Sequence, residues 1–157
     1  MELFIRKFGD LTVTELFEIY QLRESVFIVE QQCVYQDVDD YDLSAIHVFL
    51  KEDGIIQAYL RVLPRNTKFE EVSLGRIIAK KRLCGLGSKI VAEGIKAAGD
   101  YFDADTIMIG AQLQAGKFYE KQGFVQVSEE FLEDDIPHIK MIFKISDPCA
   151  SATSQDC

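Results

Sequence analysis

One segment of this chain constrains its fold more than any other: an apolar stretch that passes through a glycine loop into a helical pattern. Val72–Ala79 has the composition of a strand, and Arg82–Gly87 follows it with the spacing R-x-x-G-x-G. From Gly85 to Phe102, apolar residues recur on one side of a predicted helix. Glycines allow close backbone approach, and the exposed N–H groups at a helix start attract anions. The segment predicts an α/β unit whose loop either cradles an anion such as a diphosphate or is only a tight turn.

Charge around the loop favours the anion cradle. The chain has a formal net charge of −9, yet residues 75–96 contain six cations and one anion, Glu93. The cations are Arg76, Lys80, Lys81, Arg82, Lys89 and Lys96. The loop lacks the G-x-x-x-x-G-K-[ST] spacing of a P-loop and the third glycine of a dinucleotide fingerprint. We therefore expect an anionic ligand of another class.

Further strands and helices are predicted on both sides of this unit. The capping box Thr12-Val13-Thr14-Glu15 predicts the start of a helix that reaches about Val29, and Asp53-Gly54 predicts a hairpin turn. Predicted strands cover 3–8, 47–52, 55–63, 72–79, 106–111, 124–130 and 138–145, and predicted helices cover 12–29, 85–102 and 115–122. Early hairpins followed by a strand–helix–strand crossover predict an α/β (α+β) fold, with a mixed, mostly antiparallel sheet flanked by helices.

Length and composition predict one domain. The chain of 157 residues fits one domain at 1–146, and the small, polar stretch 147–157 is expected to be a disordered tail. We expect no secretory signal and no membrane-spanning segment, and the four cysteines form no C-x-x-C pair, so a cytoplasmic location is predicted. The net charge of −9 argues against nucleic-acid and membrane partners.

A second motif makes a family resemblance specific. Gly110-Ala111-Gln112 ends a predicted strand, and Phe118-Tyr119-x-x-x-Gly123-Phe124 follows. With R-x-x-G-x-G, in this order and spacing, it resembles the signature of the GNAT superfamily of acetyl-CoA-dependent N-acyltransferases. A closer resemblance, to the ElaA-type subgroup, is carried by L-R-x-x-V-F-x-V-E-Q from Leu22, Y-x-D-x-D-x-x-D from Tyr35, Gly75-Arg76, Gly110-Ala111-Gln112 and Ile136-Pro137-His138-Ile139.

The resemblance implies how acetyl-CoA would be held. The backbone of Ile77, Ile78 and Ala79 would pair with the pantetheine arm as though it were an extra strand. Backbone N–H groups of the glycine loop would hold the diphosphate, with the loop residues Arg82, Leu83, Cys84, Gly85, Leu86, Gly87 and Ser88. Many GNAT members have Asn where this chain has Gln112-Leu113-Gln114, so Gln112 would make the corresponding side-chain contact. No metal is implied.

Three residues are candidates for proton transfer. By the resemblance, Tyr119 would lie near the cofactor sulfur and protonate the departing thiolate. A base is useful as well, because a free alkylamine has a pKa of about 10 and must lose its proton to attack. One candidate is His138, because an imidazole ordinarily titrates near neutrality. The other is Glu30, because partial burial at a helix end would raise the pKa of a carboxylate. Each of the three also has a purely structural interpretation.

Other clusters of reactive or charged residues are weaker candidates. Cys84 lies in the anion loop, where a bound diphosphate would occupy the space that a nucleophile needs. The stretch Asp37–Asp42 lacks the glycine and glutamate of an EF-hand loop. This stretch and 129–135 are interpreted either as surfaces that attract a cationic acceptor or as solvated acidic loops. His47 has no motif partner and is assigned a structural role.

The sequence thus predicts an acetyl-CoA-dependent N-acetyltransferase that moves an acetyl group to a primary amine by direct attack in a ternary complex. A non-catalytic acyl-CoA-binding or regulatory module and a structural interaction protein are the alternatives. The acceptor, a small-molecule or peptide amine, is not specified by the motifs, and both a monomer and a homodimer are compatible with the pattern.

Overall fold

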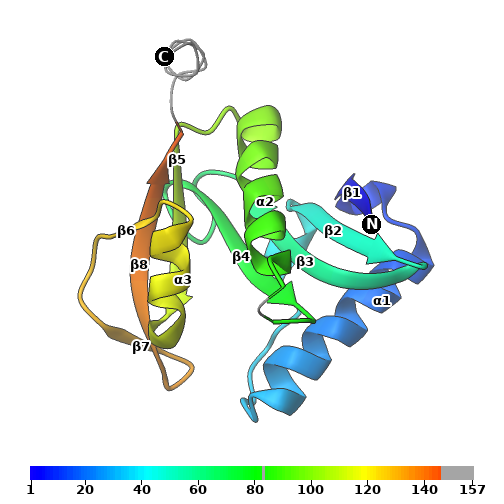
Figure 1. The fold of residues 1–157 in the computed structure, drawn as a ribbon, viewed down its shortest axis with the longest axis horizontal. Helices are drawn as coiled ribbons and strands as arrows, with labels where there is room; N and C mark the ends of the chain where they lie inside the picture. The colour runs from blue at the N-terminus through cyan, green and yellow to red at the C-terminus, as the bar shows by residue number, and fades with distance from the viewer. Residues whose placement is uncertain (83, 146–157) are drawn as a thin grey trace.

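An eight-stranded sheet organises the fold in the computed structural model, which describes residues 1–82 and 84–145 (Figure 1). The strand order is β1-β2-β3-β4-β5-β8-β6, and β7 also pairs with β8. The strands are β1 Glu2–Lys7, β2 Ile46–Glu52, β3 Ile55–Leu63, β4 Val72–Ala79, β5 Thr106–Gln112, β6 Val125–Gln126, β7 Phe131–Glu133 and β8 Ile136–Lys144. Of the described strand pairs, only β4–β5 is parallel, which confirms the predicted mixed, mostly antiparallel sheet.

Helices cover both faces of the sheet (Figure 1). The α-helices are α1 Val13–Arg23, α2 Leu86–Phe102 and α3 Gly116–Lys121; η1 Phe8–Asp10, η3 Asp40–Leu43 and η4 Leu113–Ala115 are 3₁₀ turns, and η2 Glu24–Glu30 is a π-helix. On one face, Ile90 and Val91 of α2 pack in the larger core cluster, and α3 packs against it. On the other face, Ile19 of α1 packs against Phe49 and Tyr59.

Several local predictions are confirmed. In the β2–β3 hairpin, Asp53 and Gly54 both have positive φ, at 53° and 77°. At the start of α1, the Thr12 hydroxyl accepts from the Glu15 N–H and the Glu15 carboxylate accepts from the Thr12 N–H, as a capping box requires. Helix α2 begins at Leu86 with Gly85 as its N-cap in the left-handed conformation.

Three elements differ from the prediction. The first helix is α-helical only to Arg23 and continues as the π-helix η2, because apolar spacing does not report the extra residue in a π-turn. The strand predicted at 124–130 contains only Val125–Gln126, since the Ser128 hydroxyl accepts the Lys140 N–H that a longer strand would bind. Strand β7, which was not predicted, forms a hairpin with β8 through a turn at 134–135.

Strands β4 and β5 separate soon after they begin. Their described pairing consists of Val72 with Ile107 and Ser73 with Met108. Beyond these two pairs they diverge toward their carboxyl ends, and Figure 1 shows the resulting V. Backbone groups on the β5 side of β4 therefore lack the strand neighbour that a continuous sheet would supply, which makes this edge available to another extended chain.

Some predictions fall on residues whose structure is not described. The tail predicted at 147–157, with Cys149 and Cys157, lies outside the described residues, as does Leu83 of the glycine loop. Within the described part of the chain, Cys33 and Cys84 are free thiols. No helix in that part is long and apolar enough to cross a bilayer.

Candidate functional site

The N-terminus of α2 is open to a ligand. Gly85 has φ +79°, a conformation that glycine adopts without steric cost, and no described side chain caps the helix. The first intrahelical bond runs from Lys89 N–H to the Gly85 carbonyl, so the N–H groups of 86–88 have no intrahelical partner. Helix α1 has a capping box in the same position. The uncapped start of α2 therefore has the hydrogen-bond donors and the positive dipole end that an anion requires.

Two contacts join the glycine loop to α3. A Cβ at Gly87 would lie 3.2 Å from Cζ of Phe118, so the aromatic ring fills the space that the missing side chain leaves. One residue on, the Gln122 amide donates to the Ser88 hydroxyl at 2.9 Å. The two sequence motifs, about 30 residues apart, are therefore packed together in the fold.

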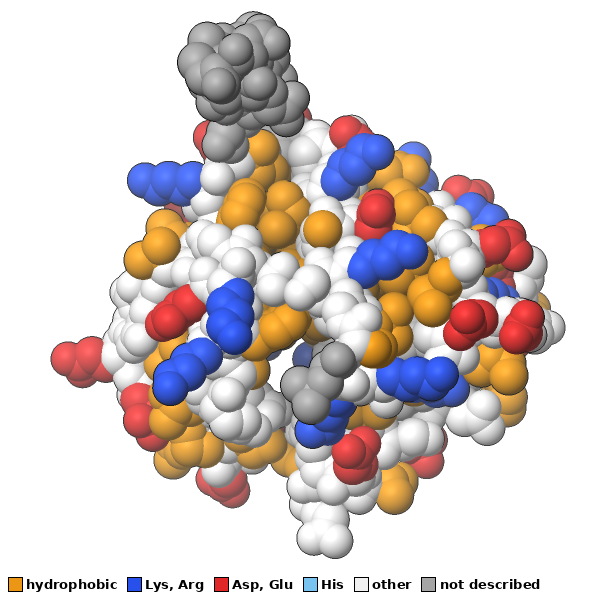
Figure 2. All heavy atoms as spheres, viewed as in Figure 1, with side chains coloured by type: hydrophobic (Ala, Val, Ile, Leu, Met, Phe, Trp, Pro, Cys, Tyr) orange, Lys and Arg blue, Asp and Glu red, His pale blue; other side chains and the backbone are white. Residues whose placement is uncertain are grey.

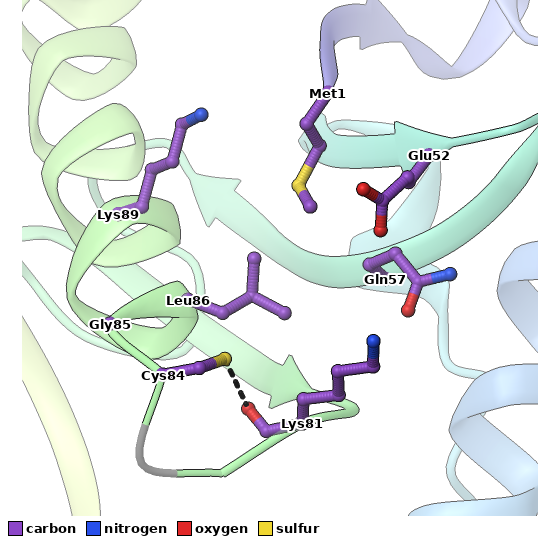
Figure 3. Close-up of a pocket in the computed structure, with 8 residues that line it drawn as sticks. All are labelled: Met1, Glu52, Gln57, Lys81, Cys84, Gly85, Leu86 and Lys89. Carbon is purple, nitrogen blue, oxygen red and sulfur yellow. Dashed lines mark hydrogen bonds between the residues drawn. The ribbon is translucent and has the colours of Figure 1, made fainter.

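Positive charge lies around this helix start (Figure 2). Lys81 and Lys89 line a hollow of about 180 Å³ beside it, together with Met1, Glu52, Gln57, Cys84, Gly85 and Leu86 (Figure 3). The Cys84 thiol donates to the Lys81 carbonyl at 3.4 Å (Figure 3). This bond folds the loop back on itself and gives the Cys84 thiol a role in loop geometry.

The predicted pantetheine edge lies at the V. Ile78 pairs with Tyr59 and Ala79 with Ala58 on the β3 side of β4, and Lys80 N–H donates to the Gln57 carbonyl just beyond. On the β5 side, the described pairing stops at Ser73. The backbone from Ile77 to Ala79 therefore pairs with β3 along one edge, while its other edge faces the V. An extended ligand that adds to the sheet as a further strand requires such an edge.

Tyr119 lies on the α3 side of the sheet. Its ring makes edge-on contacts with Phe118 and Phe124, at centroid distances of 5.1 and 5.9 Å. Burial raises the pKa of the Tyr119 hydroxyl to about 12. At neutral pH the phenol is therefore fully protonated and able to donate.

His138 lies on the opposite face. Its neighbour Ile139 packs against Gly116 of α3, and alternation along β8 turns His138 to the α1 side. The His138 Nδ1–H donates to the Ile136 carbonyl at 2.7 Å, because a carbonyl can only accept. In the neutral ring Nε2 thus keeps its lone pair, 3.5 Å from a Glu133 carboxylate oxygen that would stabilise a positive charge on the imidazole.

Glu30 and Gln112 both contact other loops at the open end of the V. Glu30 is 57% exposed and lies 3.3 Å from Arg82, so the partial burial predicted for this carboxylate is wrong. The reason is that η2 ends at the surface, where Glu30 meets the glycine loop instead of the core. The Gln112 amide donates to the Gln31 side chain at 3.2 Å and accepts from Gln114 at 2.7 Å.

The sequence did not predict a buried network of charges on the α1 side. Arg23 Nε donates to Asp37 at 3.0 Å, and Arg61 Nη1 donates to Asp42 at 2.9 Å. The full network contains three arginines and three aspartates, Arg23, Arg61, Arg76, Asp37, Asp39 and Asp42, whose formal charges cancel. The interpretations of Asp37, Asp39 and Asp42 as an attracting surface or as solvated loop residues are therefore both wrong. The signal that could have revealed the network is Arg61 itself, a charged residue inside the apolar run of β3.

His47 is buried beside this network. Its Nε2–H donates to the Asp42 carbonyl at 3.0 Å, so its Nδ1 accepts from the Tyr59 hydroxyl at 2.8 Å. Burial lowers the pKa of the His47 imidazole below its usual 6.5. Both ring nitrogens have protein partners, in agreement with the structural role assigned to this residue.

In the second acidic stretch, the described contacts are mainly structural. Glu133 pairs with Lys68 at 2.9 Å and faces His138. Asp134 and Asp135 form the tight turn between β7 and β8, both with positive φ. Within the described residues, no group of three or more His, Cys, Asp or Glu side chains is arranged to hold a metal ion.

Comparisons with known proteins agree with this architecture. Residues 17–145 match the family model described as an acetyltransferase (GNAT) domain. A UPF0039 protein of Schizosaccharomyces pombe is 34% identical over 145 residues, covering 90% of this chain and 95% of that protein. Escherichia coli ElaA is 35% identical over 137 residues, 85% of this chain and 90% of ElaA.

Two solved structures superpose on nearly the whole chain. The crystal structure of E. coli ElaA has a TM-score of 0.83 and 32% identity, covering 92% of this chain and all of that one (100%). An acyl-CoA N-acyltransferase from Pseudomonas aeruginosa has a TM-score of 0.83 and 37% identity, with 91% and 99% covered.

Proposed function

The chain belongs to the GNAT acetyltransferase family, in its ElaA-type group, and is an acyltransferase; we propose that it transfers an acetyl group from acetyl-CoA to a primary amine by direct attack in a ternary complex. One observation carries this proposal. The uncapped start of α2 lies at the end of β4, whose edge is free toward the V, and Gly87 packs this start onto the helix that carries Tyr119.

The described residues suit acetyl-CoA in three ways. The N–H groups of 86–88 would bind the diphosphate, with Lys81, Arg82 and Lys89 nearby to neutralise its charge. The free edge of Ile77–Ala79 would bind the pantetheine arm. Once bound, acetyl-CoA supplies an activated thioester carbonyl, and a backbone N–H of the same strand would stabilise the charge that develops on the carbonyl oxygen.

Tyr119 is the proposed general acid. Its neutral phenol would give a proton to the departing thiolate, and the raised pKa keeps that proton in place at working pH. Its position next to Phe118, which fills the space beside Gly87, ties the acid to the glycine loop.

His138 is the proposed base for the amine, with Glu30 as the alternative. The bond from Nδ1–H to Ile136 leaves Nε2 as the proton acceptor, and Glu133 would stabilise the resulting imidazolium. Glu30 is exposed, and its carboxylate is engaged by Arg82 of the glycine loop at 3.3 Å. Because His138 and Tyr119 lie on opposite faces of the sheet, the amine would approach from the α1 side and the thiolate would leave on the α3 side.

The acceptor is proposed only as a small-molecule or peptide primary amine. Asp37, Asp39 and Asp42 are paired with arginines and contribute little field to a distant ligand. Within the two acidic stretches, 37–42 and 129–135, the carboxylates that are exposed and could attract a cationic acceptor are Asp40, Glu129, Glu130, Asp134 and Asp135.

Acceptor-dependent thiol release tests the proposal. The chain would be incubated with acetyl-CoA and a panel of polyamines, amino acids and lysine peptides, with His138→Gln and Glu30→Gln as matched variants. Release with at least one amine supports the transferase, and a loss of about 10²-fold in kcat in the His138 variant alone supports that base. Binding of CoA without release across the panel would instead indicate the non-catalytic acyl-CoA-binding module.

A further inference from the structure

Arg76 has an unusual backbone conformation in the middle of β4. Its φ is +52°, in the left-handed region that favours glycine. The β3–β4 register shifts at the same point: Tyr59 pairs with Ile78 and Arg61 with Gly75, so Leu60 faces two residues, Arg76 and Ile77. This is a β-bulge, and in the bulge type that needs a left-handed residue glycine is the usual occupant.

The Arg76 side chain is held from the acidic loop. Its Nε lies 2.8 Å from Asp37 Oδ1, and its Nη2 donates to the Asp37 carbonyl at 3.1 Å. The guanidinium also lies 5.4 Å from the centre of the Tyr35 ring, over its face. A strained backbone conformation persists only where its surroundings hold it, and these contacts can do so.

Asp37 is itself fixed from two other directions. Arg23 donates to its second oxygen at 3.0 Å, and the Tyr35 hydroxyl donates to Oδ1 at 2.8 Å. Asp37 and Arg23 are both buried. The carboxylate therefore has little freedom to follow Arg76 if the bulge relaxes, so it acts as a rigid anchor.

We propose that Asp37 and Arg76 are positioning residues for acyl transfer, which together hold the β4 bulge so that the backbone of Ile77–Ala79 faces the V. The inference rests on the acyl-transfer function proposed above. The bulge lies directly before the three residues proposed to bind the pantetheine arm, and after the last described pair between β4 and β5. A change in φ at Arg76 would rotate the peptide groups that follow it and redirect their N–H and C=O groups.

Stability alone gives a weaker reason for this arrangement. Buried ion pairs contribute little net stability compared with apolar residues of similar size, because desolvation offsets their attraction. Removal of one partner does lower stability, because it leaves a buried charge uncompensated. The network joins the loop at 37–42 to the bulge in β4, which is the part of the sheet nearest the proposed chemistry.

Two substitutions at Arg76 separate backbone geometry from charge. Arg76→Gly removes the side chain but accepts positive φ without steric cost, whereas Arg76→Val removes it and strongly disfavours positive φ. Asp103→Val is the matched control, because Asp103 has φ +50° at the C-cap of α2, remote from the bulge. The readouts are kcat, the Kd for CoA, the melting temperature and amide exchange at Ile77 and Ile78.

If Asp37 and Arg76 hold the bulge, Arg76→Val lowers kcat by about tenfold or more, because it loses the contact and disfavours positive φ. Arg76→Gly, which loses the contact alone, lowers kcat by about threefold or more, and Asp103→Val lowers it by less than about threefold. Amide exchange at Ile77 and Ile78 speeds up most in the valine variant, and the Kd for CoA rises most there as well, because these residues are the ones proposed to bind the pantetheine arm. Wild-type kcat in Arg76→Gly would overturn the inference, since the bulge would then hold its position without the contact between Arg76 and Asp37. Wild-type kcat in Arg76→Val would overturn it as well. Absence of acceptor-dependent release by the wild-type chain is a different outcome, which overturns the proposed function itself.

Discussion

The ring of Phe118 occupies the space where a side chain at residue 87 would lie, 3.2 Å from a Cβ at that position. The second glycine of R-x-x-G-x-G therefore leaves the space in which an aromatic ring of the second motif packs. Phe118 also makes an edge-on contact with Tyr119. The anion-binding loop and the proposed acid are in this way part of one packed unit, and a shift in one would displace the other.

Gly87→Ala tests this coupling. The added methyl group requires Phe118 to move by a few tenths of an ångström, which would displace Tyr119 and lower kcat by about tenfold, since small misplacements of reacting groups are costly. Steady-state kinetics at saturating acetyl-CoA measure the effect. Gly9→Ala is the control, because no atom lies within 4 Å of a Cβ there and Gly9 lies in η1, outside the glycine loop. Equal kcat in the two variants would show that Phe118 yields without moving the acid.

Gly94→Ala is expected to destabilise the fold. A Cβ on Gly94 would lie 2.6 and 2.9 Å from the two methyl carbons of Leu60, which is fully buried and cannot move aside freely. Overpacking of this kind costs about 1–3 kcal/mol, measured as the free energy of unfolding in urea. Gly9→Ala, with no atom within 4 Å of its Cβ, should change that free energy by less than about 0.5 kcal/mol. A small loss of unfolding free energy in both Gly94→Ala and Gly9→Ala would mean that helix α2 can shift away from β3.

Stability should fall as the pH drops below 6.5. Burial lowers the pKa of His47, so its contribution to stability is complete above the unfolded value of 6.5 and is lost as the pH falls toward the folded value. A second window belongs to Asp39. Burial of Asp39 raises the pKa of its carboxyl group, but the hydrogen bond and positive charge of Arg61 lower this pKa by more. The contribution of Asp39 to stability is therefore lost only below pH 3.8. Urea unfolding at a series of pH values measures both windows.

His47→Gln gives the matched comparison for this pH dependence. In the variant, the fall in unfolding free energy just below pH 6.5 should largely disappear, while the fall below pH 3.8 should remain. An unchanged dependence of the unfolding free energy on pH below 6.5 would mean that another group titrates there.

Tyr119 should keep its proton far into the alkaline range. Its pKa of about 12 predicts that a step in the tyrosinate absorbance near that value disappears in Tyr119→Phe. The same shift implies that stability contributed by the neutral phenol is complete below pH 10 and is lost as the pH rises toward 12. A variant spectrum that loses a step near pH 10 instead would show that the hydroxyl is solvated.

The sequence predicted the elements whose signals are local. β4 has the predicted bounds, the hairpin at Asp53-Gly54 has the predicted turn, and α2 starts within one residue of the prediction. In each case, apolar periodicity or the conformational freedom of glycine acts over a few residues.

What the sequence could not predict depends on distant partners. The acidic loop looked like a surface feature because composition does not report burial, yet the buried Asp37 carboxylate pairs with Arg23 and with Arg76, which is 39 residues away. The exposure of Glu30 likewise depends on where η2 ends and on Arg82. No local pattern distinguishes a paired buried carboxylate from a solvated one, which is why the candidate acidic sites were the least accurate predictions.

The central claim is that this chain transfers an acyl group with Tyr119 as the acid, and turnover by Tyr119→Phe tests it most directly. With an acceptor identified by thiol release, kcat at saturating acetyl-CoA and the Kd for CoA would be measured for the wild-type chain and the variant. The account predicts that kcat falls by about 10²-fold while the Kd changes by less than about threefold. An unchanged kcat in the variant would contradict it.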